Sequence, residues 1–176
     1  MIKTTKINTP LGEMTAAATD EGICLLEFSD NKVLSSDYEN IVLLFKTSIK
    51  EGRNRHLRQL KKELKEYFTG KRKEFSVPIV VPGTEFQKSV WSTLLNIPYG
   101  TTMSYQEQAH ILKNPGSVRA VAHANSMNRI AIIIPCHRVI GSDGKLVGYG
   151  GGLERKKWLI NHERKHSGKP SDLVLF

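Results

Sequence analysis

Short apolar runs and turn residues alternate along the first third of the chain. Apolar and β-branched residues gather in the runs 2–8, 13–18 and 23–28, and the turn-forming triplets 10–12 and 20–22 separate them. Short runs bounded by glycine, proline and aspartate are typical of strands joined by tight turns. The pattern therefore predicts an antiparallel meander of three strands.

The period then changes from strand to helix. Between residues 54 and 70 the apolar positions return at helical spacing, with lysine and arginine between them. These apolar positions share one face of the predicted helix: Leu57, Leu60, Leu64, Tyr67 and Phe68. Residues 76–83 follow as a last strand and a linker. We place the domain boundary there, which gives an N-terminal domain of residues 1–81 and a C-terminal domain of residues 82–176.

Helix signals dominate the second domain. Thr84 with Gln87, and Ser104 with Glu107, have the spacing of capping boxes that open helices. The helix that begins at Ser104 stops at residues 113–116, and a third helix begins at once. Helix, four-residue turn, helix is the spacing of a helix-turn-helix, although many helical hairpins look the same.

The third helix of this domain, residues 117–126, has an unusual composition. Its side chains are small at Ala120, Ala122 and Ala124, and Arg119 is its one long basic residue. Small side chains allow a close approach either to DNA or to a neighbouring helix. The pattern favours neither of these two interpretations.

Charge points toward a polyanionic partner. The chain of 176 residues carries a net charge of +9, of which +6 falls after residue 83. Such a balance is typical of nucleic-acid binding, although solubility alone explains it equally well.

Composition argues against a membrane protein and against a metal site. The apolar stretch from Ile130 to Pro135 is the longest and is far too short to span a bilayer, and the N-terminus lacks the apolar core of a signal peptide. The two cysteines, Cys24 and Cys136, have no CxxC partner, so we expect no zinc ribbon and no disulfide framework. We predict a cytoplasmic protein without a bound metal.

The sequence AIIIPCHRVI at residues 131–140 carries the strongest chemical signal. Its three isoleucines predict a buried strand or extended segment, which Pro135 ends. Cys136 follows directly. An isolated cysteine is most often an inert buried thiol, but His137 and Arg138 both favour the thiolate that a nucleophile requires.

The stretch PCHRVIGSDGKLVGYGGGLERKKWLINHE, with SYQEQA upstream, resembles the methylated-DNA–protein-cysteine methyltransferase family, the O6-alkylguanine-DNA alkyltransferases. The resemblance covers residues 80–165. It implies an α/β (α+β) fold, with an N-terminal RNase H-like antiparallel sheet and helix before a helical C-terminal domain that contains a winged helix-turn-helix. It also implies a monomer that binds the minor groove of double-stranded DNA, flips the damaged nucleotide and transfers the alkyl group irreversibly to its own cysteine, once per molecule and without a cofactor.

The resemblance assigns chemical roles to five residues. Cys136 matches the alkyl acceptor, and His137 matches the residue that takes the thiol proton through a water. Glu163 matches the carboxylate that orients this histidine. Asn128 matches the residue that ties the helix-turn-helix to the active-site segment. Tyr105 matches the tyrosine that crowds the DNA phosphate and donates to the guanine ring as it leaves.

Further residues correspond to the DNA and base contacts. Arg119 matches the arginine that fills the gap left by the flipped base, and Ala120 and Ala124 allow the approach to the minor groove. Four residues match the walls of the base pocket: Val139, Tyr149, Gly150 and Gly151. The chain departs from the family pattern at Arg129, where many members have proline, and at Gly150, where some have serine. The resemblance leaves open which alkyl groups react and whether O4-alkylthymine is a substrate.

Two other functions compete with alkyl transfer. A winged-helix DNA-binding protein without catalysis explains the charge and the helix-turn-helix, but not the residues around Cys136. A thiol hydrolase with a Cys–His pair explains the cysteine, but nothing in the sequence resembles a hydrolytic oxyanion loop. A stable gain of one alkyl group on Cys136 would separate these alternatives.

Overall fold

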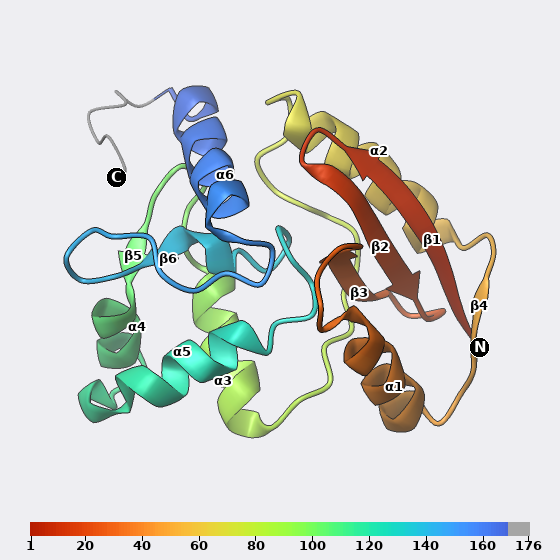
Figure 1. Ribbon diagram of the computed structural model, residues 1–176, viewed down its shortest axis with the longest axis horizontal. Helices are drawn as coiled ribbons and strands as arrows, with labels where there is room; N and C mark the ends of the chain where they lie inside the picture. Colours follow the sequence, from red (N-terminus) through yellow and green to blue (C-terminus); the bar gives the residue numbers. More distant parts are fainter. Residues whose placement is uncertain (169–176) are drawn as a thin grey trace. The chain divides into compact units, whose positions relative to one another are not determined.

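The computed structural model describes residues 1–168 (Figure 1). The chain divides into two compact units. Residues 1–82 together with 129–131 form the first unit, and residues 83–128 together with the chain from residue 132 onward form the second. The three-residue segment 129–131 is therefore separated in the sequence from the rest of its unit.

A four-stranded sheet in the order β3-β2-β1-β4 is the centre of the first unit (Figure 1). The predicted meander is confirmed, since β1–β2 and β2–β3 pair antiparallel, and a short fourth strand joins β1 in parallel. The strands are β1 (Ile2–Thr9), β2 (Gly12–Ala18), β3 (Ile23–Phe28) and β4 (Ile49–Glu51). Every residue of β3 is buried, which explains why its sequence is a continuous apolar run broken only by Glu27.

Two helices accompany this sheet. The predicted helix is α2 (Arg55–Phe68), and its apolar face contacts β1 and β2. The side chain of Asn54 accepts a hydrogen bond from the His56 amide at its N-terminus. A second helix, α1 (Leu34–Phe45), contacts β3 and was not predicted. Ile41 is its buried residue, and Leu34, Tyr38 and Phe45 pack beside it against the core at helical spacing, so the apolar periodicity of this helix was present in the sequence and was overlooked.

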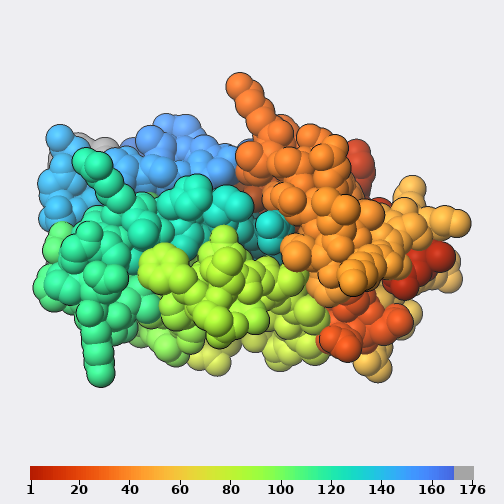
Figure 2. Space-filling view, turned by 90° about the horizontal axis from the view of Figure 1, so that it is seen from below, coloured from red at the N-terminus to blue at the C-terminus, as the bar shows by residue number. Residues whose placement is uncertain are grey.

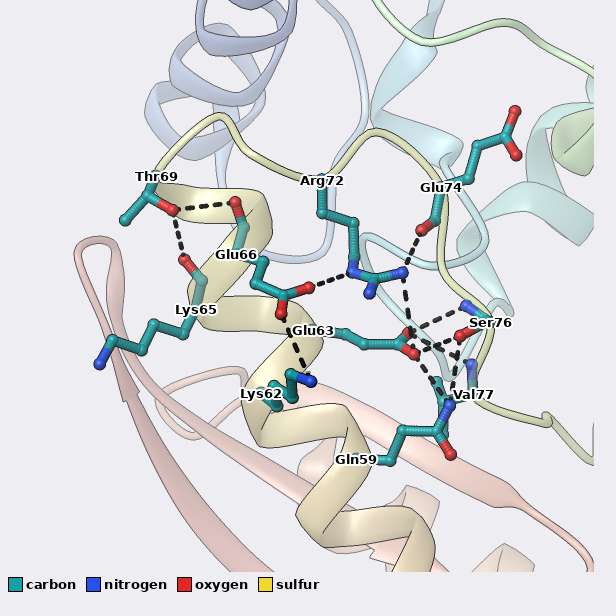
Figure 3. Close-up of polar contacts among 10 residues, drawn as sticks. All are labelled: Gln59, Lys62, Glu63, Lys65, Glu66, Thr69, Arg72, Glu74, Ser76 and Val77. Atoms are coloured by element: carbon teal, nitrogen blue, oxygen red, sulfur yellow. Dashed lines mark hydrogen bonds and ion pairs between the residues drawn. The ribbon is translucent and has the colours of Figure 1, made fainter.

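The segment after α2 is held by the buried carboxylate of Glu63 (Figure 3). This carboxylate accepts hydrogen bonds from the backbone amides of Ser76, at 2.9 Å, and Val77, at 3.2 Å. Residues 76–83 were predicted as a last strand and a linker, and the strand is wrong, because only one parallel bridge forms there, between Ile79 and Ile23. Two amides of the segment already bond to Glu63, and Pro78 has no N–H to offer a ladder.

The second unit is mainly helical, which confirms the predicted fold class. Both capping boxes are present, at Thr84 with Gln87 and at Ser104 with Glu107. The helices are α3 (Glu85–Leu95), α4 (Tyr105–Ile111), η1 (Pro115–Ser117), α5 (Val118–Ser126), η2 (Cys136–Arg138) and α6 (Leu153–His166). Two short strands, β5 (Met103–Ser104) and β6 (Val139–Ile140), pair in parallel.

Helices α3, α4 and α5 pack together through a polar as well as an apolar contact. The buried amides of Gln108 and Asn125 donate to each other, at 3.1 Å and 2.7 Å. The indole of Trp91 donates to the carbonyl of Ala124 at 2.9 Å. These bonds hold α4 and α5 in the helix-turn-helix arrangement and attach α3 to α5. Figure 2 shows residues of all three helices, coloured yellow-green to teal, on one face.

Candidate active site

A tight turn, and not the predicted buried strand or extended segment, leads to Cys136. Residues 131–134 are buried as expected, but Ile132 has a φ of 71°. A left-handed conformation costs an L-residue about 1–2 kcal/mol, and a β-branched side chain makes it rarer still. Hydrogen bonds fix this turn, because Asn128 Nδ2 donates to the Ile134 carbonyl at 2.9 Å and the Cys136 amide donates to the same oxygen at 2.8 Å.

Cys136 is the first residue of the short helix η2, and it is partly exposed between buried neighbours. Its Sγ lies 3.4 Å from Asn128 Nδ2, which donates to it. A donor directed at sulfur favours the thiolate over the thiol. Asn128 therefore both shapes the turn and stabilises the nucleophilic form of the cysteine.

Glu163 of α6 binds the two residues that follow the cysteine. Its Oε1 lies 2.7 Å from His137 Nε2, and Arg138 donates to both carboxylate oxygens at 2.8 Å and 3.0 Å. The contact with Glu163 requires a proton on Nε2 of His137, so Nδ1 of the neutral ring is left as an acceptor. Nδ1 is buried and no group of residues 1–168 hydrogen-bonds to it.

Burial controls the ionisation of this cluster. Burial would raise the pKa of Glu163, but His137 and Arg138 together lower it well below the ordinary value, so the carboxylate is charged. Burial lowers the pKa of His137, and Glu163 raises it only in part because Arg138 opposes the effect. The carboxylate alone would make His137 more basic, but the net effect of the site is a neutral imidazole.

Lys156 is a site residue that the sequence analysis missed. Its fully buried ammonium donates to the carbonyls of Val147 and Gly148, at 2.8 Å and 3.1 Å, and lies 5.7 Å from the centre of the Tyr105 ring. Burial lowers the pKa of Lys156 to about 8, although the negative charge of a Cys136 thiolate raises it. A signal was present, since Lys156 precedes Glu163 by seven positions and shares the buried face of α6.

Tyr105 lies at the start of α4, beside the same loop. Its hydroxyl donates to the Val147 carbonyl at 3.2 Å. Burial raises the pKa of Tyr105 to about 12, and the negative charge of a Cys136 thiolate adds to this effect. The hydroxyl therefore carries its proton at neutral pH and can donate it to a group in the site. Parallel pairing of β5 with β6 joins the start of α4 to the end of η2.

The remaining predicted residues lie in β6, in the loop between β6 and α6, and on α5. Val139 is fully buried in β6, while Tyr149, Gly150 and Gly151 lie in the loop between β6 and α6. Arg119 and Ala120 are on the exposed side of α5. Ala124 differs, because it is only 2% exposed and its carbonyl binds Trp91. Its small size serves helix packing, so it does not belong to the exposed face on which we expected it.

Comparison with known proteins identifies the family. Residues 2–81 match the family model described as 6-O-methylguanine DNA methyltransferase, ribonuclease-like domain, and residues 85–165 match its DNA binding domain. The chain belongs to the methylated-DNA–protein-cysteine methyltransferase family. The recognition made from the PCHR and SYQEQA motifs is thereby confirmed.

Relatives of this methyltransferase family match along nearly the whole chain. The methylated-DNA–protein-cysteine methyltransferase of Mycolicibacterium paratuberculosis is 42% identical over 176 residues, which cover 100% of this chain and 99% of that protein. The one from Methanosarcina barkeri is 40% identical over 164 residues, 91% of this chain and 96% of that protein.

Solved structures of methyltransferases give the same result. The crystal structure of Mycobacterium tuberculosis OGT in complex with DNA superposes with a TM-score of 0.80 at 38% identity, over 97% of this chain and 96% of that one. The Pyrococcus kodakaraensis enzyme, at 22% identity and a TM-score of 0.64, shares the fold. None of the helices within residues 1–168 is long and apolar enough to cross a membrane.

Proposed function

We propose that the protein repairs DNA by moving the alkyl group of O6-alkylguanine onto Sγ of Cys136, once per molecule. The S–C bond forms as the bond from carbon to O6 breaks, and the repaired guanine leaves. The observation that carries this proposal is the contact of Cys136 Sγ with Asn128 beside a buried His137–Glu163 pair. The irreversible thioether explains why a single protein molecule acts once.

His137 supplies the base in this reaction. Its Nδ1 is an acceptor without a protein partner in the described part of the chain, and a buried polar atom of this kind commonly binds a water. Such a water would pass the thiol proton from Cys136 to Nδ1. The Glu163 carboxylate stabilises the imidazolium that results, because it already accepts the hydrogen bond from Nε2.

Tyr105 and Lys156 serve the leaving group and the thiolate. The guanine anion is a poor leaving group unless a donor meets its charge, and the protonated Tyr105 hydroxyl is suited to that role. The Lys156 ammonium favours the negative charge on Cys136. We assign the walls of the base pocket to Val139 and to the loop residues Tyr149, Gly150 and Gly151.

DNA binding is assigned to residues 82–176, with residues 1–81 as a separate N-terminal domain. Family membership and the DNA complex of the mycobacterial structure support binding of DNA, and we propose that this DNA is double-stranded. We propose that α5 enters the minor groove of DNA bound by a monomer, with Arg119 in the gap left by the flipped base and Ala120 on the contact face. Flipping costs a few kcal/mol, which the plug and the pocket must offset.

The test is the mass of the protein after incubation with a duplex that contains O6-methylguanine. We expect one methyl group on the Cys136 peptide and a yield that never exceeds one per protein molecule. Tight binding without a mass gain would instead support a non-catalytic winged-helix protein, and product beyond one equivalent would support a thiol hydrolase. A parallel duplex with O4-methylthymine tests the second substrate.

A further inference from the structure

The segment 129–131 forms part of the N-terminal unit, although it lies just before Cys136 in the sequence. It joins β3, the edge strand of the sheet, by two backbone hydrogen bonds. The Leu26 amide donates to the Arg129 carbonyl at 2.9 Å, and the Ala131 amide donates to the Leu26 carbonyl at 2.8 Å. A bridge of one residue is a weak attachment, because it has no neighbouring ladder to support it.

A side-chain contact reinforces this attachment. Arg129 Nε lies 3.3 Å from Oδ1 of Asp37, in the first turn of α1. The two side chains are only 12% and 13% exposed, so water screens this ion pair much less than a surface pair. The N-terminal end of a helix also favours a carboxylate. Arg129 is thus held through both its backbone and its side chain.

The residues on either side of this segment determine the geometry of the cysteine. Asn128, which precedes it, donates to the Ile134 carbonyl and to Cys136 Sγ. Ile132, which follows it, has the strained φ of 71°. A strained turn persists only when its surroundings fix both of its ends. Residues 129–131 are the fixed end on the N-terminal side of the turn.

We propose that Asp37 is a positioning residue for alkyl transfer, since its ion pair with Arg129 fixes the backbone from which Asn128 and the Ile132 turn present Cys136. This inference rests on the proposed transfer to Cys136. Asp37 touches neither the substrate nor the thiol. Its effect passes through the backbone of residues 128–132, so it alters the geometry of the sulfur and leaves the DNA-binding face unchanged.

The test compares Asp37→Asn with the double exchange Asp37→Arg/Arg129→Asp, which restores opposite charges. Glu13→Gln is the control, because it removes an exposed ion pair with Lys6 from the same unit. We measure single-turnover transfer from free O6-benzylguanine at saturation, well below the unfolding temperature of each variant. Misplacement of a nucleophile by a fraction of an ångström costs on the order of tenfold in rate, which is the loss expected for Asp37→Asn.

Three results together support the positioning role. Asp37→Asn slows transfer at saturation without a change in half-saturating concentration, the double exchange recovers most of the rate, and Glu13→Gln reacts as the wild type does. Equal rates in Asp37→Asn and wild type would overturn the proposal. So would a slow double exchange whose melting temperature equals that of the wild type.

A second readout does not depend on alkyl transfer. Iodoacetamide modifies Cys136 as the thiolate, and peptide mass mapping separates it from the buried Cys24. If Asp37 maintains the Asn128 contact with Sγ, the pH midpoint of modification rises in Asp37→Asn and returns in the double exchange. An unchanged midpoint refutes the positioning role. Absence of transfer in the wild type, together with a shifted midpoint, would reject the proposed function while supporting the positioning role.

Discussion

Replacement of Lys156 by methionine tests whether the buried ammonium promotes alkyl transfer while it lowers the stability of the folded protein. Lys156 is fully buried on α6, and its Nζ contacts only backbone carbonyls among the hydrogen-bond partners described above. Methionine has a similar length and no charge. The substitution therefore removes the ammonium while filling most of the space that the side chain occupies.

The magnitude follows from the pKa of Lys156. Burial lowers it from 10.5 to about 8, so between these pH values the unfolded chain holds a proton that the folded protein has released. Stability rises with pH wherever the unfolded state binds more protons. Relative to Lys156→Met, the wild type should gain about 3 kcal/mol of unfolding free energy between pH 8 and pH 10.5, and no such gain below pH 8.

The assay is urea unfolding of both proteins at several pH values across that window. Taking the difference between the two proteins cancels the other lysines and tyrosines that titrate there. Lys157→Met is the matched control, because Lys157 is the exposed neighbour on the same helix. A difference that stays flat from pH 8 to pH 10.5 would refute the reasoning, as would an equal slope for Lys157→Met.

The same variant should also react more slowly. Without the ammonium, the Cys136 thiolate loses a nearby positive charge, so transfer from O6-benzylguanine at pH 7 should fall. Two effects are therefore expected in Lys156→Met. Its alkyl transfer is slower than that of the wild type, and below pH 8 it lacks the buried charge that destabilises the wild-type fold. A fully active variant would show that Asn128 and His137 suffice to ionise the cysteine.

Three further substitutions test other parts of the site. Glu163→Gln leaves the buried Arg138 without its anion, so we expect the free energy of unfolding in urea to fall by about 3–5 kcal/mol. At low temperature we expect at least about a tenfold lower single-turnover rate with DNA binding retained, and an unchanged pH–rate profile would contradict proton transfer from Cys136 to His137. Arg119→Ala should slow repair of duplex DNA far more than transfer from free O6-benzylguanine, and equal losses would exclude a flipping role. Gly151→Arg should block benzyl transfer more than methyl transfer, and equal rates on both substrates would show that the loop does not wall the pocket.

The sequence predicted those elements whose signals are local. The meander was readable because turn residues separate its strands, and α3 and α4 were readable from capping boxes at Thr84 and Ser104. Helix α1 also has a local signal, the apolar stripe of Leu34, Tyr38, Ile41 and Phe45, and this signal was overlooked. Strand β4 has three residues, which is too short to show any period.

The site was predictable in its chemistry and less so in its shape. Motifs identified Cys136 and the residues assigned to act on it, and the roles of those residues stay predictions until the experiments above are done. The turn at Ile132 was not predictable, because a β-branched residue disfavours positive φ and the sequence does not show the hydrogen bonds of Asn128 and Cys136 that fix the turn. Lys156 was overlooked because a lysine in a basic run is usually solvated, and burial in a fold is not a local property of the sequence.

The bridge between Leu26 and Ile130 requires the N-terminal sheet to form before residues 129–131 can attach to it. During synthesis the meander leaves the ribosome long before residues 129–131 are made, and domains generally fold as units from the N-terminus. Residues 129–131, which precede the strained turn at Ile132, can join β3 only after that sheet has formed. While the N-terminal sheet is unfolded, residues 129–131 lack the strand to which they attach, and the positioning that we propose for Cys136 is therefore completed only after that sheet has formed.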